Sequence, residues 1–144
     1  MSGLVLKLAA GESFVVNGAV VENCDKPTRI RIADADARVL RCRDALRPEE
    51  VDTPVKRVYY AIQLLITGDL EEDNTLPAID EQFELLQDVF ATINAGLVPK
   101  LREMVSRGNY YSALCQLRHL VTLEAELFRR GGVETQPAFE RKVA

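Results

Sequence analysis

The sequence predicts an α+β fold, with an N-terminal antiparallel sheet of about four to five short strands followed by a four-helix C-terminal part. The first third combines alternating apolar and polar residues with tight turns, whereas the remainder places apolar residues at helical spacing between glycines. At 144 residues, 47% apolar and 28% charged, the chain is long enough to bury one core without disulfides. We therefore expect one domain over residues 1–144, divided into a β-rich part (1–47), a helical part (48–132) and a mobile tail (133–144).

Period-two alternation marks the strands of the β-rich part. Residues 4–8 alternate between leucine and other side chains, as in a half-buried strand. Asn17-Gly18 lies between two β-rich runs, and this pair is a strong hairpin signal because both residues tolerate positive φ. The predicted strands after residue 8 are therefore 13–16 and 19–23, joined as a hairpin, and then 29–32 and 38–43.

Helix signals begin where the polar connector 44–53 ends. Thr53 and Pro54 predict a helix start, because a hydroxyl caps the first turn and proline lacks an N–H that this position does not need. Gly68 predicts the end of this helix, before an acidic loop at 68–77. Glycines separate the remaining helices, which we expect near 79–93, 97–107 and 110–130.

The second of these helices carries an apolar seam with steps of four and three residues. Such a seam is either part of the core or the interface with a partner helix. Core is the better interpretation because the seam is short. The seam consists of Ile79, Phe83, Leu86, Phe90 and Ile93.

Charge is unevenly spread along a chain whose net charge is −4. Within residues 26–47, seven basic residues stand against three acidic ones, whereas the last 84 residues carry a net −5. Alternation places Arg29 and Arg31 on one face of their strand, and Arg41 and Arg43 on one face of theirs. If the two strands pair, up to four arginines share one solvent face. That face is either an anion-binding surface or a solvated surface that resists edge-to-edge aggregation.

The sequence lacks the residue patterns of an enzyme. Cys24, Cys42 and Cys115 are scattered without a CxxC pair, and no phosphate-binding loop or metal motif occurs, so we expect no cofactor and no metal. The enzyme alternative requires a cleft around the single histidine, His119, with Cys115 or an acid nearby. The chain shows neither a run apolar enough to span a bilayer nor a signal peptide, so we expect a cytoplasmic protein without membrane binding.

Three stretches of the chain are distinctive in their order and spacing: 15–32, 39–65 and 108–124. The middle stretch is the most specific, because it contains a proline and two acids, then Asp52-Thr53-Pro54 and Lys56-Arg57, before a helix with aromatic residues. Together the three stretches resemble the FlbT family of flagellum biosynthesis regulators. The resemblance implies post-transcriptional repression of flagellin synthesis at the 5′ untranslated region of flagellin mRNA, together with the small flagellar protein FlaF.

RNA binding of the kind that the resemblance implies would use basic side chains, because cations contact phosphates and guanidinium planes stack on bases. Phe14 is the single aromatic residue among the first 58, so a sheet of stacking aromatics is excluded. The expected RNA-binding residues are Lys26, Arg29, Arg31, Arg41, Arg43, Lys56 and Arg57.

An adaptor or chaperone-like module is the alternative function. In that case the helices bind flagellin or FlaF, and the effect on mRNA is indirect. The expected contact residues are Phe83, Leu86, Phe90 and Ile93. The strands also resemble the dimeric RNA-binding regulator CsrA, so a homodimer through the sheet is a further expectation.

Overall fold

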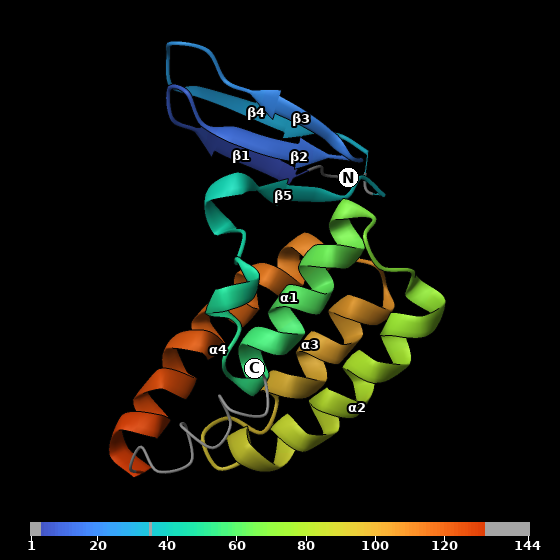
Figure 1. Ribbon diagram of the computed structural model, residues 1–144, viewed down its shortest axis with the longest axis vertical. Coiled ribbons are helices and arrows are strands. Elements are labelled where there is room, and N and C mark those ends of the chain that lie inside the picture. Colours follow the sequence, from blue (N-terminus) through green and yellow to red (C-terminus); the bar gives the residue numbers. More distant parts are fainter. Residues whose placement is uncertain (1–3, 35, 132–144) are drawn as a thin grey trace.

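A computed structural model describes residues 4–34 and 36–131, with the strands gathered at one end of the molecule and the helices at the other (Figure 1). The strands form two small antiparallel sheets, which we call the outer and the inner sheet. The outer sheet pairs β1 (Leu4–Leu8) with β4 (Thr28–Ile32). The inner sheet has the strand order β3-β2-β5, from β2 (Ser13–Val16), β3 (Ala19–Glu22) and β5 (Val39–Arg41).

The β2–β3 hairpin confirms the turn that the sequence predicts. Asn17 and Gly18 have φ values of 50° and 85°, and Val16 lies opposite Ala19. Positive φ at both central residues is the geometry of a two-residue turn whose twist matches that of the flanking strands. Asn17 also positions the start of β5, because its side-chain Oδ1 accepts a hydrogen bond from the N–H of Arg38, the residue before that strand, at 2.9 Å.

Two strands of the inner sheet, β2 and β5, are covered on both faces. One face carries Phe14 and Val39, which pack with the inward leucines of β1 in a small core of their own. The other face carries Val15 and Leu40, which pack against the helices. The molecule therefore has three layers, in the order outer sheet, inner sheet and helices. The expected pairing of the arginine-bearing strands is wrong, because β4 pairs with β1 and β5 pairs with β2.

The first helix, α1 (Pro54–Thr67), has the predicted ends. Thr53 Oγ1 accepts from the Lys56 N–H at 3.2 Å, and Gly68 ends the helix in the left-handed conformation, with φ 87°. A carboxylate from the last helix supports the same helix start. Glu124 is 6% exposed, and its Oε2 accepts from the Val55 N–H at 3.1 Å. The N-terminus of α1 is therefore stabilised from both its own cap and the last helix.

The remaining helices are α2 (Glu72–Phe90), α3 (Leu97–Ser106) and α4 (Tyr110–Gly131), of which the last two confirm the predicted bounds within one residue. The prediction of an acidic loop at 68–77 is wrong beyond Glu71. Acidic side chains in the first turn of α2 suit the helix dipole. Pro77 lies in the second turn of α2 and is exposed; because proline has no N–H, the helix lacks the backbone hydrogen bond that this position would donate to the Asp73 carbonyl oxygen.

The apolar seam of α2 belongs to the core. Phe83, Leu86 and Phe90 are 1%, 3% and 0% exposed and pack with residues of α1, α3 and α4. The expectation that they contact a partner protein is therefore wrong, whereas Ile93, beyond the end of α2, is 46% exposed. The polar connector contains two short 3-10 turns, η1 (Cys42–Asp44) and η2 (Pro48–Glu50). The predicted tail, 133–144, lies outside the described residues.

Candidate nucleic-acid interface

Three basic side chains lie on the solvent face of the outer sheet. Lys7 and Arg29 are direct cross-strand partners, and Arg31 lies two residues further along β4, opposite Val5. Alternation turns these side chains outward, because Leu6 and Ile30 between them face the inner sheet. We call Lys7, Arg29 and Arg31, all of them exposed, the basic face.

Stability does not explain the basic face. Among residues 4–34 and 36–131, none of its three cations has an ion-pair partner. Like charges directly opposite each other on an antiparallel pair, as Lys7 and Arg29 are, destabilise a sheet.

Lys26 lies in the turn that leads into β4. Its carbonyl oxygen accepts from Asn23 Nδ2 at 2.9 Å and from Thr28 Oγ1 at 3.0 Å, so the backbone of this turn is held in place. The Lys26 side chain is exposed. It lies two residues from the start of β4 and extends the positive charge beyond the end of that strand.

Arg41 is buried, and the expectation that it shares a solvent face with Arg29 is wrong. It is 8% exposed, because β5 is covered by the outer sheet on one side and by helices on the other. Its Nε donates to Glu12 Oε2 at 2.7 Å, and its Nη2 donates to the Lys7 carbonyl oxygen at 2.6 Å. Arg41 therefore ties the inner sheet to β1 and is unavailable to a ligand.

The charge of Arg41 is matched by Glu12, whose side chain is 7% exposed. Hydrogen bonds from the Ala9 N–H and from Arg41 lower the pKa of the Glu12 carboxyl below its usual value. Arg43 reaches the same carboxylate, with Nε 3.5 Å from Oε2, but its side chain is 59% exposed. Arg43 belongs to η1, beyond the end of β5, so it too lies apart from the basic face.

Lys56 and Arg57 are also separated from the basic face. They lie in the first turn of α1, which begins at the end of the helical part away from the strands (Figure 1). Lys56 Nζ is 3.2 Å from Asp52 Oδ1, and both side chains are partly buried. The structure therefore divides the seven expected RNA-binding residues among several places, and brings Arg29 and Arg31 together with Lys7, which the sequence reasoning missed.

Arg38 marks a further group that sequence reasoning missed. Its Nη1 donates to the Leu65 carbonyl oxygen at 2.9 Å, and its Nη2 lies 2.7 Å from Glu72 Oε2. The guanidinium also lies over the Tyr110 ring, and the Tyr110 hydroxyl donates to Glu72 at 2.5 Å. Burial and this hydrogen bond raise the pKa of Tyr110 to about 12. The group joins the strands to three helices and has no signal in the sequence, because its members are far apart along the chain.

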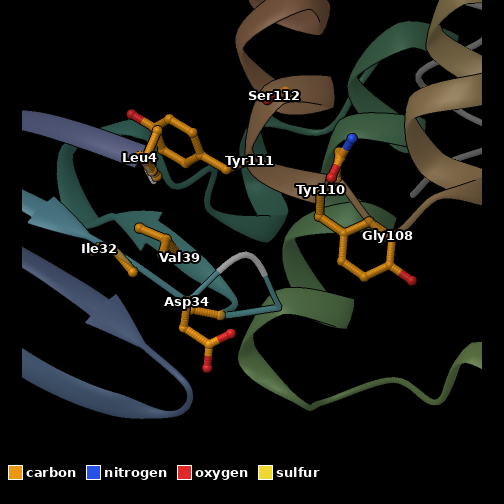
Figure 2. A pocket seen from close by; sticks show the side chains of 10 residues that line it. Leu4, Ile32, Asp34, Val39, Gly108, Tyr110, Tyr111 and Ser112 are labelled. Atoms are coloured by element: carbon orange, nitrogen blue, oxygen red, sulfur yellow. The ribbon is translucent and has the colours of Figure 1, made fainter. Parts of the chain in front are cut away.

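A pocket of about 280 Å3 lies beside this group, between the strands and the start of α4 (Figure 2). Leu4, Ile32 and Val39 line it from the strands, and Tyr110 lines it from α4. Of the lining residues that the structure describes, only Asp34 is charged. A negatively charged, partly apolar pocket does not suit a phosphate. His119, around which the enzyme alternative requires a cleft, is exposed on α4 and does not line this pocket.

An exposed apolar row follows the outer side of α2. Leu85 and Val89 are 61% and 52% exposed and lie one helical turn apart on the same side of α2, and Ile93, three residues beyond the end of the helix, is 46% exposed. α2 has six acidic residues and no lysine or arginine. This row, rather than the buried seam, is the exposed apolar surface of α2.

Within residues 4–34 and 36–131, no helix is long and apolar enough to cross a membrane. No group of histidine, cysteine and acidic side chains there is suited to hold a metal ion.

Known proteins resemble the chain over nearly its whole length. The Chelativorans sp. protein named probable flagellum biosynthesis repressor protein FlbT is 30% identical over 140 residues, which cover 96% of this chain and 94% of that protein. The Rhodopseudomonas palustris protein of the same name is 34% identical over 134 residues, covering 88% and 98%. The Caulobacter vibrioides flagellum biosynthesis repressor protein FlbT is 30% identical over 127 residues, covering 85% and 87%.

No solved structure matches the chain. The family described as flagellar protein FlbT matches residues 4–128, which include every strand and nearly all of the four helices. The chain therefore belongs to the FlbT family of flagellar proteins.

Proposed function

We propose that this protein represses flagellum biosynthesis by binding the 5′ untranslated region of flagellin mRNA through the basic face. Family membership supports the flagellar role, since relatives over most of the chain are named flagellum biosynthesis repressors. The single observation that carries the RNA-binding step is the row of exposed, unpaired cations on the outer sheet, Lys7, Arg29 and Arg31.

The geometry of the basic face suits a single-stranded backbone. By strand geometry, the Cα atoms of Arg29 and Arg31 are about 7 Å apart along β4, and the Cβ atoms of Lys7 and Arg29 are about 5 Å apart across the strand pair. Three cations at this spacing can contact successive phosphates, and the two guanidinium planes can stack on bases. Phe14 is buried between the sheets, so arginine planes, rather than aromatic rings, supply the stacking surfaces of the strands.

The chain as a whole is acidic, so the proposed RNA contacts depend on the local positive charge of the basic face. A net charge of −4 gives little long-range attraction for RNA, so non-specific binding is weak. When log affinity is plotted against log salt concentration, each neutralised phosphate of a single strand contributes about −0.7 to the slope. Three contacts therefore predict a salt slope of about −2.

The test compares two triple variants with the same loss of charge. Lys7→Ala/Arg29→Ala/Arg31→Ala removes the basic face, whereas Arg47→Ala/Lys100→Ala/Arg107→Ala removes three exposed cations elsewhere. Binding to a fluorescent flagellin leader RNA is measured by anisotropy over a salt series. We expect the first variant to lose affinity and most of the salt slope, and the second to bind like the wild type. Equal effects of the two variants would contradict the proposal.

An adaptor function is the second candidate, and the exposed row on α2 favours it. Leu85 and Val89 are 61% and 52% exposed, in a helix whose larger apolar residues are otherwise mostly buried. The adaptor proposal predicts that purified FlaF or flagellin binds the wild-type chain, and that Leu85→Ser/Val89→Ser abolishes this binding without unfolding the chain. If leader RNA binds only after such a partner is added, the adaptor function replaces direct RNA binding.

A further inference from the structure

The outer edge of β3 is a free strand edge. All four residues of β3 are exposed, and Val20 is 71% exposed. β3 pairs with β2 on its inner side, and within 4–34 and 36–131 no backbone hydrogen bond reaches its other side. Proteins protect such edges with charged side chains, above all lysine, and with proline, a bulge, a covering segment or a short strand. β3, Ala19-Val20-Val21-Glu22, is short and has a single charge, Glu22, at its end, and it contains no lysine and no proline.

The hairpin geometry determines which backbone groups face outward. Val16 and Ala19 flank the two-residue turn and therefore form a hydrogen-bonded pair. Every second pair along the ladder is of this kind, which includes Phe14 with Val21. The bond from Asn23 N to Glu12 O, 2.8 Å long, continues this alternation. The N–H and C=O groups of Val20 and Glu22 consequently point away from β2, at the open edge.

We propose that a second copy of this chain pairs with the open edge, so that β3 and β3 of the second copy run antiparallel about a two-fold axis at Val21. In this register the two Val21 residues face each other as a non-hydrogen-bonded pair. On either side, Val20 of one copy and Glu22 of the other form a hydrogen-bonded pair. All four outward groups in each copy are then satisfied.

Three features favour a second copy over an unrelated strand. The edge is self-complementary, because one two-fold axis satisfies its outward groups on both copies. The charge pattern agrees, because Glu22, the single charge of β3, lies opposite Val20 rather than opposite the other Glu22. The edge is also continuous with an ordered sheet, since pairing extends the three-stranded inner sheet to six strands across the axis.

This inference is independent of the proposed function, but it bears on it. A dimer through β3 joins two inner sheets and leaves both outer sheets, and hence both basic faces, unpaired. One particle then presents two RNA-binding surfaces, which raises the effective affinity for a leader with two contact sites.

Position-specific cross-linking tests the register. Cα atoms of a non-hydrogen-bonded pair are about 4.5 Å apart, within the range that a disulfide spans. In a background of Cys24→Ser/Cys42→Ser, which removes the two exposed thiols, Val21→Cys and Val20→Cys are oxidised in parallel. We expect Val21→Cys to form a covalent dimer rapidly and Val20→Cys to remain largely monomeric. Rapid cross-linking through Val20→Cys, or equal slow cross-linking of both variants, overturns the register.

Sedimentation of the otherwise wild-type chain over a concentration series tests the dimer itself. Val20→Pro removes an outward N–H that the β2–β3 ladder does not use, so the hairpin keeps its own hydrogen bonds. Two of the four intermolecular bonds are lost, and we expect the dissociation constant to rise at least about tenfold. Val20→Thr keeps the N–H and the branched side chain, and should dimerise like the wild type. A wild-type chain that stays monomeric up to its solubility limit overturns the proposal.

Discussion

Arg41→Ala removes the guanidinium that joins the two sheets, and it separates a structural role from an RNA-binding one. The change deletes the bond to Glu12 and the bond to the Lys7 carbonyl oxygen, and leaves a carboxylate that is 7% exposed without its cation. Breaking a buried ion pair on one side costs about 3–5 kcal/mol. Because the pair lies in a thin layer near solvent, we expect about 3 kcal/mol, or a fall in Tm of about 6–12 °C for a chain of this size.

Urea denaturation followed by circular dichroism measures this cost, with Arg43→Ala as the matched control. Arg43 approaches the same carboxylate, but its side chain is 59% exposed, so its loss should cost less than about 0.5 kcal/mol. If Arg41→Ala were no more destabilising than Arg43→Ala, or if it lost RNA affinity while keeping full stability, the assignment of Arg41 to the fold would be refuted.

The pH dependence of the same pair has a definite sign. The pKa of Glu12 is lowered in the folded chain, so the stabilisation is present above the unfolded pKa of about 4.3 and is lost as pH falls through the folded pKa. The stability gap between the wild type and Arg41→Ala should therefore narrow in acid, because a protonated Glu12 no longer needs a cation.

Three further predictions concern the helical part. Thr53→Ala removes the cap of α1 and should lower the free energy of unfolding by about 1 kcal/mol in urea titrations. Phe83→Ala should cost about 3–5 kcal/mol by the same measurement, and Leu85→Ala less than about 0.5 kcal/mol, because the first side chain is 1% and the second 61% exposed. Burial raises the pKa of Glu124, so this group costs stability as pH rises from about 4.3 through its folded pKa. Tm measured across pH should show this loss in the wild type and not in Glu124→Gln; an unchanged profile would contradict it.

Local signals predicted much of the fold because each depends on residues close in sequence. The Asn17-Gly18 turn, the Thr53 cap and the glycine after α1 all act within one turn of backbone. The acidic loop was predicted too long, because acids and a proline are typical of loops, but acids also suit the first turn of a helix, as in α2, and a proline can be accommodated at an exposed position of the second turn.

The candidate site was predicted only in part. The alternating pattern correctly predicted that Arg29 and Arg31 face solvent, since side chains alternate between two faces in any strand. It could not distinguish their face from that of Arg41, because β5 alternates equally well but is enclosed on both sides. Lys7 was missed because its place beside Arg29 depends on the pairing of strands about 20 residues apart.

The sequence by itself determined the class of fold, the order of its elements, most of their ends and the family. Only the tertiary structure decided that β4 pairs with β1, that Arg41 is an internal tie, and that the seam of α2 is core while Leu85 and Val89 are exposed. The physical reason is that the free energy of the whole molecule, rather than any local stretch, determines which strands pair and which faces are buried. Apolar side chains and arginines allow several pairings locally, and only the packing of all three layers selects one.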